Sequence, residues 1–341
     1  QTGEESIANK IISELKNAGI SQFNEFFIDN SKWGSQTIPN GWVWEDIGNY
    51  FGAGSGAFNW HENQYDIILK PGSKIGDDVT IISQSPESNI KLIAELKTAA
   101  KGTGDQAYIF FTPNSSVNYI RGTIPVGNES FTVKAAAADA VNLFSNKMNN
   151  ALKQSGYQDV EVKSVQNYDR KAFQQINQTL LYSFFSPTLD SINYWFLKKS
   201  VNLFGESFVK SIGYEKRKTG STDSGVSVIR DFWSKNGINK SALKMIDGSG
   251  LSPANRVTTK ALVTVMQFAK SRPWFDSFFH ALPEMNGIKM KDGYIGGVRS
   301  YTGYIRSKNG NEFIFSFIVN NFDGNPGTAR EKMWKVLDIL K

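Results

Sequence analysis

The stretch MKDGYIGGVRSYTGYIRSKNGNEFIFSF, residues 290–317, decides the fold of the C-terminal part of the chain. Asn309-Gly310 predicts a tight type I′ turn, because both central residues of that turn need a positive φ. The segment is therefore expected to form two antiparallel strands folded back on each other. Gly293, Gly296 and Gly297 then lie inside the first strand, where glycine is uncommon unless a bulge forms or another backbone comes close.

Segments with the apolar spacing of amphipathic helices flank this hairpin. Residues 188–213 predict two helices separated near Lys198–Ser200, and further helices are predicted within 221–238, 255–272 and 328–341. Helices, then antiparallel strands, then a final helix are typical of an α+β domain in which helices pack on an antiparallel sheet. We expect this domain to cover residues 177–341.

The first half of the chain follows a different plan. Residues 4–20 and 136–156 predict helices that end in the similar sequences SELKNAGI and NALKQSGY, and a strand is expected after each. These two helix–strand units predict one α/β domain, in two parts, 1–61 and 136–176. Between them, residues 62–135 contain short β-rich runs broken by Gly, Pro, Asn and Ser, which indicates a nested β-rich domain.

The composition of the chain excludes several kinds of chemistry. The 341 residues include 38 Lys and Arg against 32 Asp and Glu, a net charge of +6 that favours anionic surroundings. No long run of like charges predicts a nucleic-acid-binding surface, and no apolar run has the length of a membrane span. Without cysteine there is no thiol catalysis or thiolate metal site. His61 and His280 lie far apart, so neither a Ser-His-Asp triad, nor a metal site, nor a cofactor is expected.

Two short motifs are candidates for a catalytic site. Lys291-Asp292-Gly293 leads directly into the glycine-bearing strand, whereas the literal Lys-Thr-Gly at 218–220 precedes a helix in a polar linker. Ser200-Val201-Asn202 lies at the predicted break between two helices and follows two lysines. Ser and Asn at this spacing can both point into one cleft, while Val201 faces away. The alternative is that Ser200 is a simple helix N-cap.

Together these motifs resemble the second and third motifs of the active-serine penicillin-recognising enzymes. Longer blocks at 41–65, 198–213, 247–259 and 296–305 are similar to the low-molecular-mass class C penicillin-binding proteins, which are D-alanyl-D-alanine carboxypeptidases and endopeptidases. The resemblance runs from the first helix to the C-terminus. That family inserts further domains into its penicillin-binding domain. The resemblance therefore implies an α+β fold with the second half of a serine β-lactamase-like domain, plus inserted α/β and β-rich domains.

The resemblance also implies roles for individual residues. Ser200 would relay a proton toward the nitrogen of the leaving D-alanine, and Asn202 would hold the amide of the substrate. Lys291 would donate a hydrogen bond to Ser200 and attract the terminal carboxylate of the peptide. A backbone N–H near Tyr294 would form half of the oxyanion hole, and the strand would pair with the substrate backbone. The expected substrate-binding residues on this strand are Gly293, Tyr294 and Ile295.

The nucleophile of the family lies in a Ser-x-x-Lys motif, which is expected upstream of Gln1. The chain contains four literal matches, none of which occupies the family position: Ser13–Lys16, Ser88–Lys91, Ser207–Lys210 and Ser241–Lys244. The expected function is thus a serine peptidase that forms an acyl-enzyme on a serine outside this chain. The alternative is a non-catalytic protein that binds cell-wall peptides and has kept the fold without the nucleophile.

The chain departs from the family pattern at Asp292, where the third motif has Thr or Ser. Because strand residues alternate between faces, Asp292 is expected to face away from Lys291 and Gly293 and to be tolerated. The implied partners are stem peptides of peptidoglycan, with β-lactams as covalent inhibitors, in the periplasm or another extracytoplasmic compartment. A peripheral membrane contact stays open, no nucleic-acid partner is expected, and the oligomeric state is not predicted.

The Gly-rich block DGSGLS at 247–252 has two interpretations. It lacks the lysine spacing of a phosphate-binding loop and does not follow a clear strand. We therefore expect a tight structural turn beside the cleft, in which Asp247 and Ser249 bond backbone groups.

Overall fold

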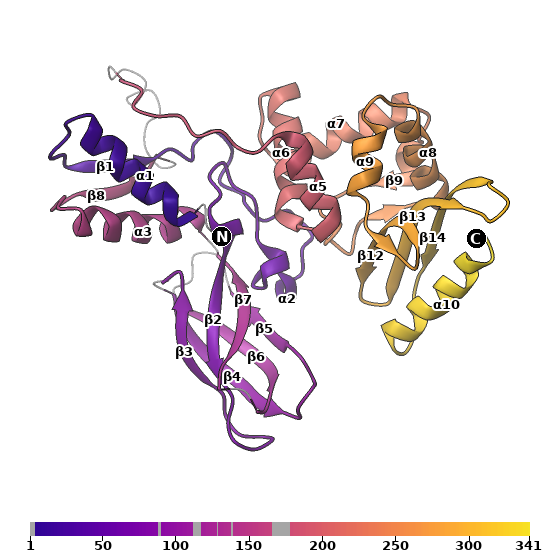
Figure 1. Ribbon diagram of the computed structural model, residues 1–341, viewed down its shortest axis with the longest axis horizontal. Coiled ribbons are helices and arrows are strands. Elements are labelled where there is room, and N and C mark those ends of the chain that lie inside the picture. The colour runs from indigo at the N-terminus through magenta and orange to yellow at the C-terminus, as the bar shows by residue number, and fades with distance from the viewer. Residues whose placement is uncertain (1–3, 88–89, 112–116, 128, 138, 166–177) are drawn as a thin grey trace. The chain divides into compact units, whose positions relative to one another are not determined.

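The computed structural model describes residues 4–87, 90–111, 117–127, 129–137, 139–165 and 178–341 (Figure 1). The chain separates into two compact units. The first comprises Gln1–Phe185 together with Thr219–Ser221, and the second comprises Ser186–Lys218 together with Thr222–Lys341. Each unit is described by itself below.

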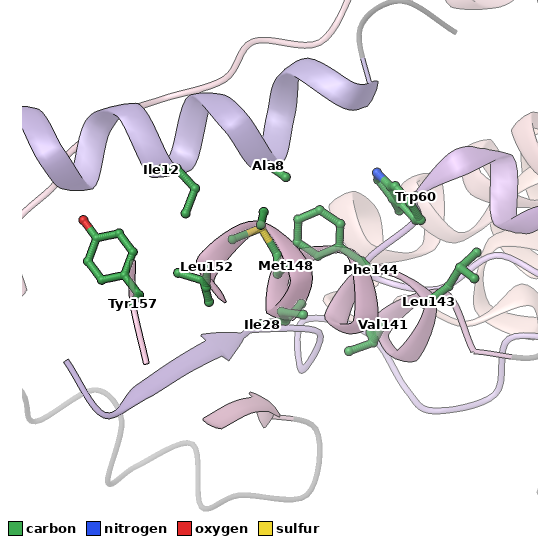
Figure 2. Close-up of a cluster of buried hydrophobic side chains, with 11 residues drawn as sticks. Ala8, Ile12, Ile28, Trp60, Val141, Leu143, Phe144, Met148, Leu152 and Tyr157 are labelled. Carbon is green, nitrogen blue, oxygen red and sulfur yellow. The ribbon is translucent and has the colours of Figure 1, made fainter. Parts of the chain in front are cut away.

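An α/β layer forms one part of the first unit. Helices α1 (Glu4–Asn17) and α3 (Ala140–Gln154) accompany strands β1 (Glu25–Ile28) and β8 (Glu161–Ser164), which pair in parallel. Figure 2 shows side chains of the two helices meeting in a closed apolar cluster. Asp139 caps α3 by accepting a hydrogen bond from the Val141 backbone N–H at 2.9 Å. The two helix–strand units thus pack together, as their similar sequences predict. The buried side chains of this cluster are Ala8, Ile12, Ile28, Trp60, Val141, Leu143, Phe144, Met148, Ala151, Leu152 and Tyr157.

Two three-stranded sheets form the β-rich part of the first unit. In one sheet the strand order is β3-β2-β7, and in the other it is β4-β6-β5, with β4 and β6 parallel. Their alternating apolar residues share one core, which includes Tyr65, Ile67 and Leu69 of β2. The bounds are β2 (Gln64–Lys70), β3 (Thr80–Ser85), β4 (Lys91–Ala99), β5 (Gln106–Phe110), β6 (Val117–Pro125) and β7 (Phe131–Ala136). The short helical elements of this unit are α2 (Trp44–Ile47), η1 (Tyr50–Gly52) and η2 (His61–Asn63). The exact four-part division predicted from the sequence stays a prediction.

A four-stranded antiparallel sheet and six helices organise the described part of the second unit. The strand order is β11-β12-β13-β14, and Ile288 and Met290 of β12 pack against Met333 and Leu337 of α10. Figure 1 shows α10 on one face of this sheet, with α8 and α9 near the other. The bounds of the helices are α5 (Leu189–Lys199), α6 (Asn202–Arg217), α7 (Thr222–Lys235), α8 (Thr259–Lys270), α9 (Phe275–Ala281) and α10 (Pro326–Asp338), with η4 (Lys240–Ala242). The strands are β9 (Leu243–Lys244), β10 (Arg256–Val257), β11 (Glu284–Met285), β12 (Ile288–Ile295), β13 (Val298–Arg306) and β14 (Glu312–Val319).

The helix-and-sheet architecture predicted for the C-terminal domain is confirmed, but the predicted first strand of its hairpin is wrong. Residues 288–306 form two strands, because the chain reverses at Gly296-Gly297, where Ile295 pairs with Val298. Gly297 has a φ of +72°, which glycine adopts at little cost. Two adjacent glycines therefore make a hairpin turn here instead of a bulge inside one strand.

The second turn lies where Asn309-Gly310 predicts it, but its type differs from the prediction. Gly310 has a φ of +81°, whereas Asn309 does not adopt a positive φ. The Gly310 N–H donates to the Ser307 carbonyl at 2.9 Å, and the Ser307 N–H donates to the Asn311 carbonyl at 2.8 Å. These bonds describe a three-residue hairpin loop that ends in a left-handed glycine rather than a two-residue type I′ turn.

Candidate active site

Ser200 lies between α5 and α6, at the break that the sequence predicts. It ends α5 in the left-handed conformation, with a φ of +54°, and its side chain is exposed. Val201 occupies the N-cap position of α6, and no side-chain hydrogen bond caps that helix. The alternative interpretation of Ser200 as an N-cap is therefore wrong. A residue with a Cβ is costly at a position where helices commonly place glycine.

Two lysines connect this break to the strand that contains Lys291. Lys198 Nζ on α5 donates to the Leu282 carbonyl at 3.2 Å, and Lys289 Nζ on β12 donates to the same carbonyl at 3.4 Å. Each lysine precedes its candidate residue, Ser200 or Lys291, by two positions. Because both side chains reach one oxygen, the break and the strand lie within two lysine lengths of each other. Asn202 is half-buried and is the first residue of α6, two positions after Ser200.

The edge of β12 is open where the substrate is expected to pair. Within the described residues, β11 pairs with β12 only at Ile288 and Lys289. The Met290 N–H points to this edge, because it donates to the Pro283 carbonyl at 3.1 Å. In an antiparallel sheet every second residue directs its backbone groups to the same edge, so the N–H and C=O groups of Asp292 and Tyr294 also point outward. This direction agrees with the expected oxyanion-hole donor near Tyr294.

Lys291 contacts its neighbour Asp292. Its Nζ donates to the Asp292 carbonyl at 2.9 Å and to the Asp292 Oδ1 at 3.0 Å. The expectation that Asp292 faces away from Lys291 is therefore wrong, because the Lys291 ammonium and the Asp292 carboxylate are in contact. Strand alternation separates the two Cβ atoms, but the long lysine side chain reaches around the open edge. Ser200 is not among the hydrogen-bond partners of Lys291 in the described part of the chain.

Hydroxyl groups that the sequence analysis missed share the sheet face with Lys291. Thr302 pairs with Lys291 across the ladder, and its Oγ1 lies 3.0 Å from Ser316 Oγ on β14. Ser300 pairs with Gly293, and a Cβ added at Gly293 would come within 2.7 Å of the Ser300 Oγ. The alternation of Ser300, Tyr301 and Thr302 in the sequence is a usable signal for this face once the register is known.

Tyr294 and Ile295 follow at the end of β12. Tyr294 is 54% exposed, and the Arg299 guanidinium lies 4.8 Å from the centre of its ring. Arg299 Nη1 also donates to the Tyr301 hydroxyl at 3.1 Å. An arginine over a tyrosine face makes a favourable cation–π contact. The side chain of Tyr294 is thus stacked on Arg299 beside the open edge, and Ile295 is half-buried.

The DGSGLS block forms the tight turn that the sequence predicts. Asp247 Oδ1 accepts from the Gly250 N–H at 2.7 Å, and its Oδ2 accepts from the Ser252 N–H at 2.6 Å. The Leu251 N–H donates to Ser249 Oγ at 3.3 Å. The prediction that Asp247 and Ser249 bond backbone groups is confirmed.

A buried carboxylate on α6, which the sequence analysis missed, holds this turn against the helix. Glu206 is fully buried, and its Oε1 accepts from the Gly248 and Ser249 N–H groups at 2.9 and 2.8 Å. The backbones cross closely, because a Cβ added at Gly248 would lie 2.2 Å from the Gly205 carbonyl oxygen. The first turns of α6, which begin at Asn202, are thereby fixed to the 247–252 turn.

Burial perturbs the ionisation of this helix face. It raises the pKa of Glu206 to about 7, and the charge of Asp247 adds to the increase, against hydrogen bonds from Ser249 and Gly248. Lys210, one helical turn further on, is also buried. Its burial lowers its pKa to about 8, against the attraction of Glu206. Both groups therefore change charge near neutral pH.

The Ser-x-x-Lys matches lie in varied surroundings. Ser207 Oγ donates to the Leu203 carbonyl at 2.8 Å, and its partner Lys210 is buried. Ser241 Oγ donates to Asn239 Oδ1 at 2.9 Å at the start of η4. Ser13 is exposed on α1. The remaining match, at Ser88, lies outside the described residues.

The described ranges contain neither a candidate metal site nor a candidate membrane span. No group of three or more His, Asp or Glu side chains there could hold a metal ion. No helix in the same ranges is both long and apolar enough to cross a bilayer.

Comparison with known proteins identifies the class of the chain. The fold matches the crystal structure of penicillin-binding protein 4 (DacB) from Haemophilus influenzae with a TM-score of 0.76 at 19% identity, over 94% of this chain and 74% of that one. The model of the D-Ala-D-Ala carboxypeptidase 3 (S13) family matches residues 4–338. The chain therefore belongs to that family, and the resemblance stated from its motifs is confirmed.

Two curated relatives show how much of a family member the chain spans. It is 24% identical to the D-alanyl-D-alanine carboxypeptidase of an Actinomadura strain, over 88% of this chain and 60% of that protein. It is 20% identical to the D-alanyl-D-alanine carboxypeptidase DacB of Haemophilus influenzae, over 92% of this chain and 68% of that protein. The chain thus spans about three fifths to two thirds of the length of these relatives.

Proposed function

We propose that this chain belongs to a serine D-alanyl-D-alanine carboxypeptidase or endopeptidase that acts on peptidoglycan stem peptides outside the cytoplasm. Family membership supports the reaction class. The observation that carries the proposal is the open edge of β12, which Lys198 and Lys289 link to the Ser200 break through the Leu282 carbonyl. An open strand edge can bind an extended peptide by adding it as a further strand.

The residues of this chain have distinct roles in the proposed reaction. A serine oxygen bonds to the carbonyl carbon between two D-alanines, the C–N bond breaks, and the leaving nitrogen takes a proton relayed by Ser200. Lys291 supplies an ammonium donor to the cleft, and Asn202 holds the amide of the substrate. The outward N–H of Tyr294 stabilises the negative oxygen that forms during attack. Water then hydrolyses the ester and restores the serine.

Intact-mass spectrometry after incubation with a penicillin tests this function. We propose that β-lactams form the same ester and stay attached as a covalent adduct. Both the present chain and the full gene product should be treated, because the comparison also locates the nucleophilic serine. An adduct on the full product alone supports the proposal and places the serine outside residues 1–341. An adduct on this chain also supports it, and peptide mapping then starts at Ser207 and Ser241.

Two lysine variants test the role of the candidate site in the species that forms the adduct. Lys291→Ala should slow acylation about 100-fold, the usual effect of losing a group that stabilises developing charge. Lys308→Ala is the matched control, because Lys308 also begins a Lys-x-Gly triplet but lies in the turn after β13. Equal effects of the two variants would contradict the assignment of Lys291.

A non-catalytic protein that binds cell-wall peptides is the competing function. It predicts no adduct on either protein but reversible binding of peptidoglycan fragments. The absence of an adduct together with such binding would replace the proposed enzyme by this alternative.

A further inference from the structure

The contact between Lys291 and Asp292 affects what the open edge can bind. Lys291 Nζ lies 2.9 Å from the Asp292 carbonyl and 3.0 Å from its carboxylate. That carbonyl is one of the outward-facing groups to which an added peptide strand would bond. The Lys291 ammonium thus already donates hydrogen bonds both to this backbone carbonyl and to the Asp292 carboxylate.

Two neighbouring cations, Lys289 and Arg299, are also engaged. Lys289 Nζ lies 4.0 Å from Glu284 Oε2 and donates to the Leu282 carbonyl. Arg299 bonds the Tyr301 hydroxyl and stacks on Tyr294, on the face of the sheet toward α10. An arriving carboxylate therefore meets a lysine whose charge is already balanced by Asp292, and it is repelled by that carboxylate.

An uncharged amide fits the same pair better than a carboxylate does. Its carbonyl oxygen can accept from Lys291 Nζ, while its N–H can donate to Asp292 Oδ1, so both charged groups keep a partner. The side chains of Lys291 and Asp292 are 27% and 37% exposed. An ion pair this accessible to solvent is weak. A ligand can therefore still reach Lys291, but ligands of different charge bind it with different affinity.

We propose that Asp292 is a specificity-determining residue. It makes this site prefer peptides in which the leaving group has no free carboxylate next to the reacting nitrogen. Such groups include an amidated end and a cross-link through a lysine-type side-chain amine. The inference rests on the proposed function and names its substrate class: cleavage of lysine-type cross-links or amidated ends is favoured over release of free D-alanine.

Binding of two matched peptides tests this inference without requiring turnover. The probes are an acetylated tripeptide that ends in Lys-D-Ala-D-Ala and the same tripeptide with a C-terminal primary amide, measured by isothermal titration. In the natural chain the amide should bind at least as tightly as the acid. In Asp292→Asn the acid should gain about tenfold, while the amide changes less than twofold. Asp323→Asn, an exposed position in the same unit, controls for the change in net charge.

The outcomes separate the inference from the function on which it rests. If the acid binds the natural chain tenfold better than the amide, or if Asp292→Asn leaves their ratio unchanged, Asp292 does not set specificity. Binding of stem peptides then still supports the proposed function. If neither peptide binds the natural chain or the variant, the proposed function itself is overturned, and the inference with it. A second variant, Asp292→Thr, must shift the ratio in the same direction as Asp292→Asn.

Discussion

Glu206→Gln should change how the stability of the second unit depends on pH. The amide keeps the shape of the side chain, and its oxygen can still accept from the Gly248 and Ser249 N–H groups. What the substitution removes is a charge that is fully buried. The second carboxylate oxygen, Oε2, has no hydrogen-bond partner among the described residues, so ionisation is poorly compensated.

The magnitude follows from the perturbed pKa of Glu206. Burial raises this pKa from 4.5 to about 7 in the folded chain. Between these values the folded state holds a proton that the unfolded state has lost, so the unfolding free energy falls as pH rises. A pKa shift of this size corresponds to about 3 kcal/mol, lost between about pH 4.5 and pH 7. Glu206→Gln should lack this loss.

Urea unfolding at several pH values between 5 and 7 measures the difference. Hydrogen exchange of peptides from α6 should be the readout, because it reports on the unit that contains Glu206. Other titrating groups contribute equally to the stability of both proteins, so their contributions cancel when the two pH curves are subtracted. Lys210 does not reverse the sign of this difference. Loss of the Glu206 charge lowers the pKa of Lys210 further, and a lysine with a lowered pKa makes the folded state more stable as pH rises.

The control is Glu215→Gln, an exposed glutamate on the same helix. Its stability curve should run parallel to that of the natural chain. The reasoning is refuted if the Glu206→Gln curve also runs parallel to the natural one between pH 5 and pH 7. It is equally refuted if the variant loses more stability than the natural chain as pH rises.

Gly248→Ala should lower the free energy of unfolding in urea by about 3 kcal/mol, because its Cβ would lie 2.2 Å from the Gly205 carbonyl oxygen. Gly296→Ala is the control: a Cβ there meets nothing within 4 Å, so the free energy of unfolding should change by less than about 0.5 kcal/mol. Equal losses would show that the crossing of α6 and the turn can relax. Phe144→Ala should cost about 4 kcal/mol in the first unit, since this ring is 4% exposed in the cluster of Figure 2; a loss under about 1 kcal/mol would contradict the packing. Asn49→Ala should cost about 2 kcal/mol by differential scanning calorimetry, because its side chain bonds two backbone groups in a buried position; an unchanged melting temperature would contradict this.

The helices and most strands could be predicted because their signals are local. The apolar spacing of residues 202–217 or 259–270 predicts a helix without knowledge of its neighbours. The turn at Gly296-Gly297 was missed because its local sequence signal is ambiguous. Two glycines inside an apolar run fit both a bulge and a hairpin turn, and only the pairing of the strands decides between them.

The candidate site was less predictable because its contacts depend on how distant parts of the chain pair and pack. The contact of Lys291 with Asp292 depends on an open strand edge, which exists because β11 ends its pairing at Lys289. The bond from Glu206 to the 247–252 turn joins residues more than forty positions apart. No spacing rule links such residues. Motif resemblance supplied Ser200 and Asn202, but it could not supply the groups that hold them in place.

The left-handed backbone of Ser200 has a consequence for how this protein would evolve in the laboratory. Its φ of +54° costs about 1 kcal/mol with serine, and glycine would avoid most of that cost. A library selected only for survival after heating should therefore accumulate glycine at position 200. A library selected for capture of a labelled penicillin should retain serine there if the hydroxyl has the proposed role. Opposite outcomes at one position would reveal a site where natural selection has favoured chemistry over heat resistance.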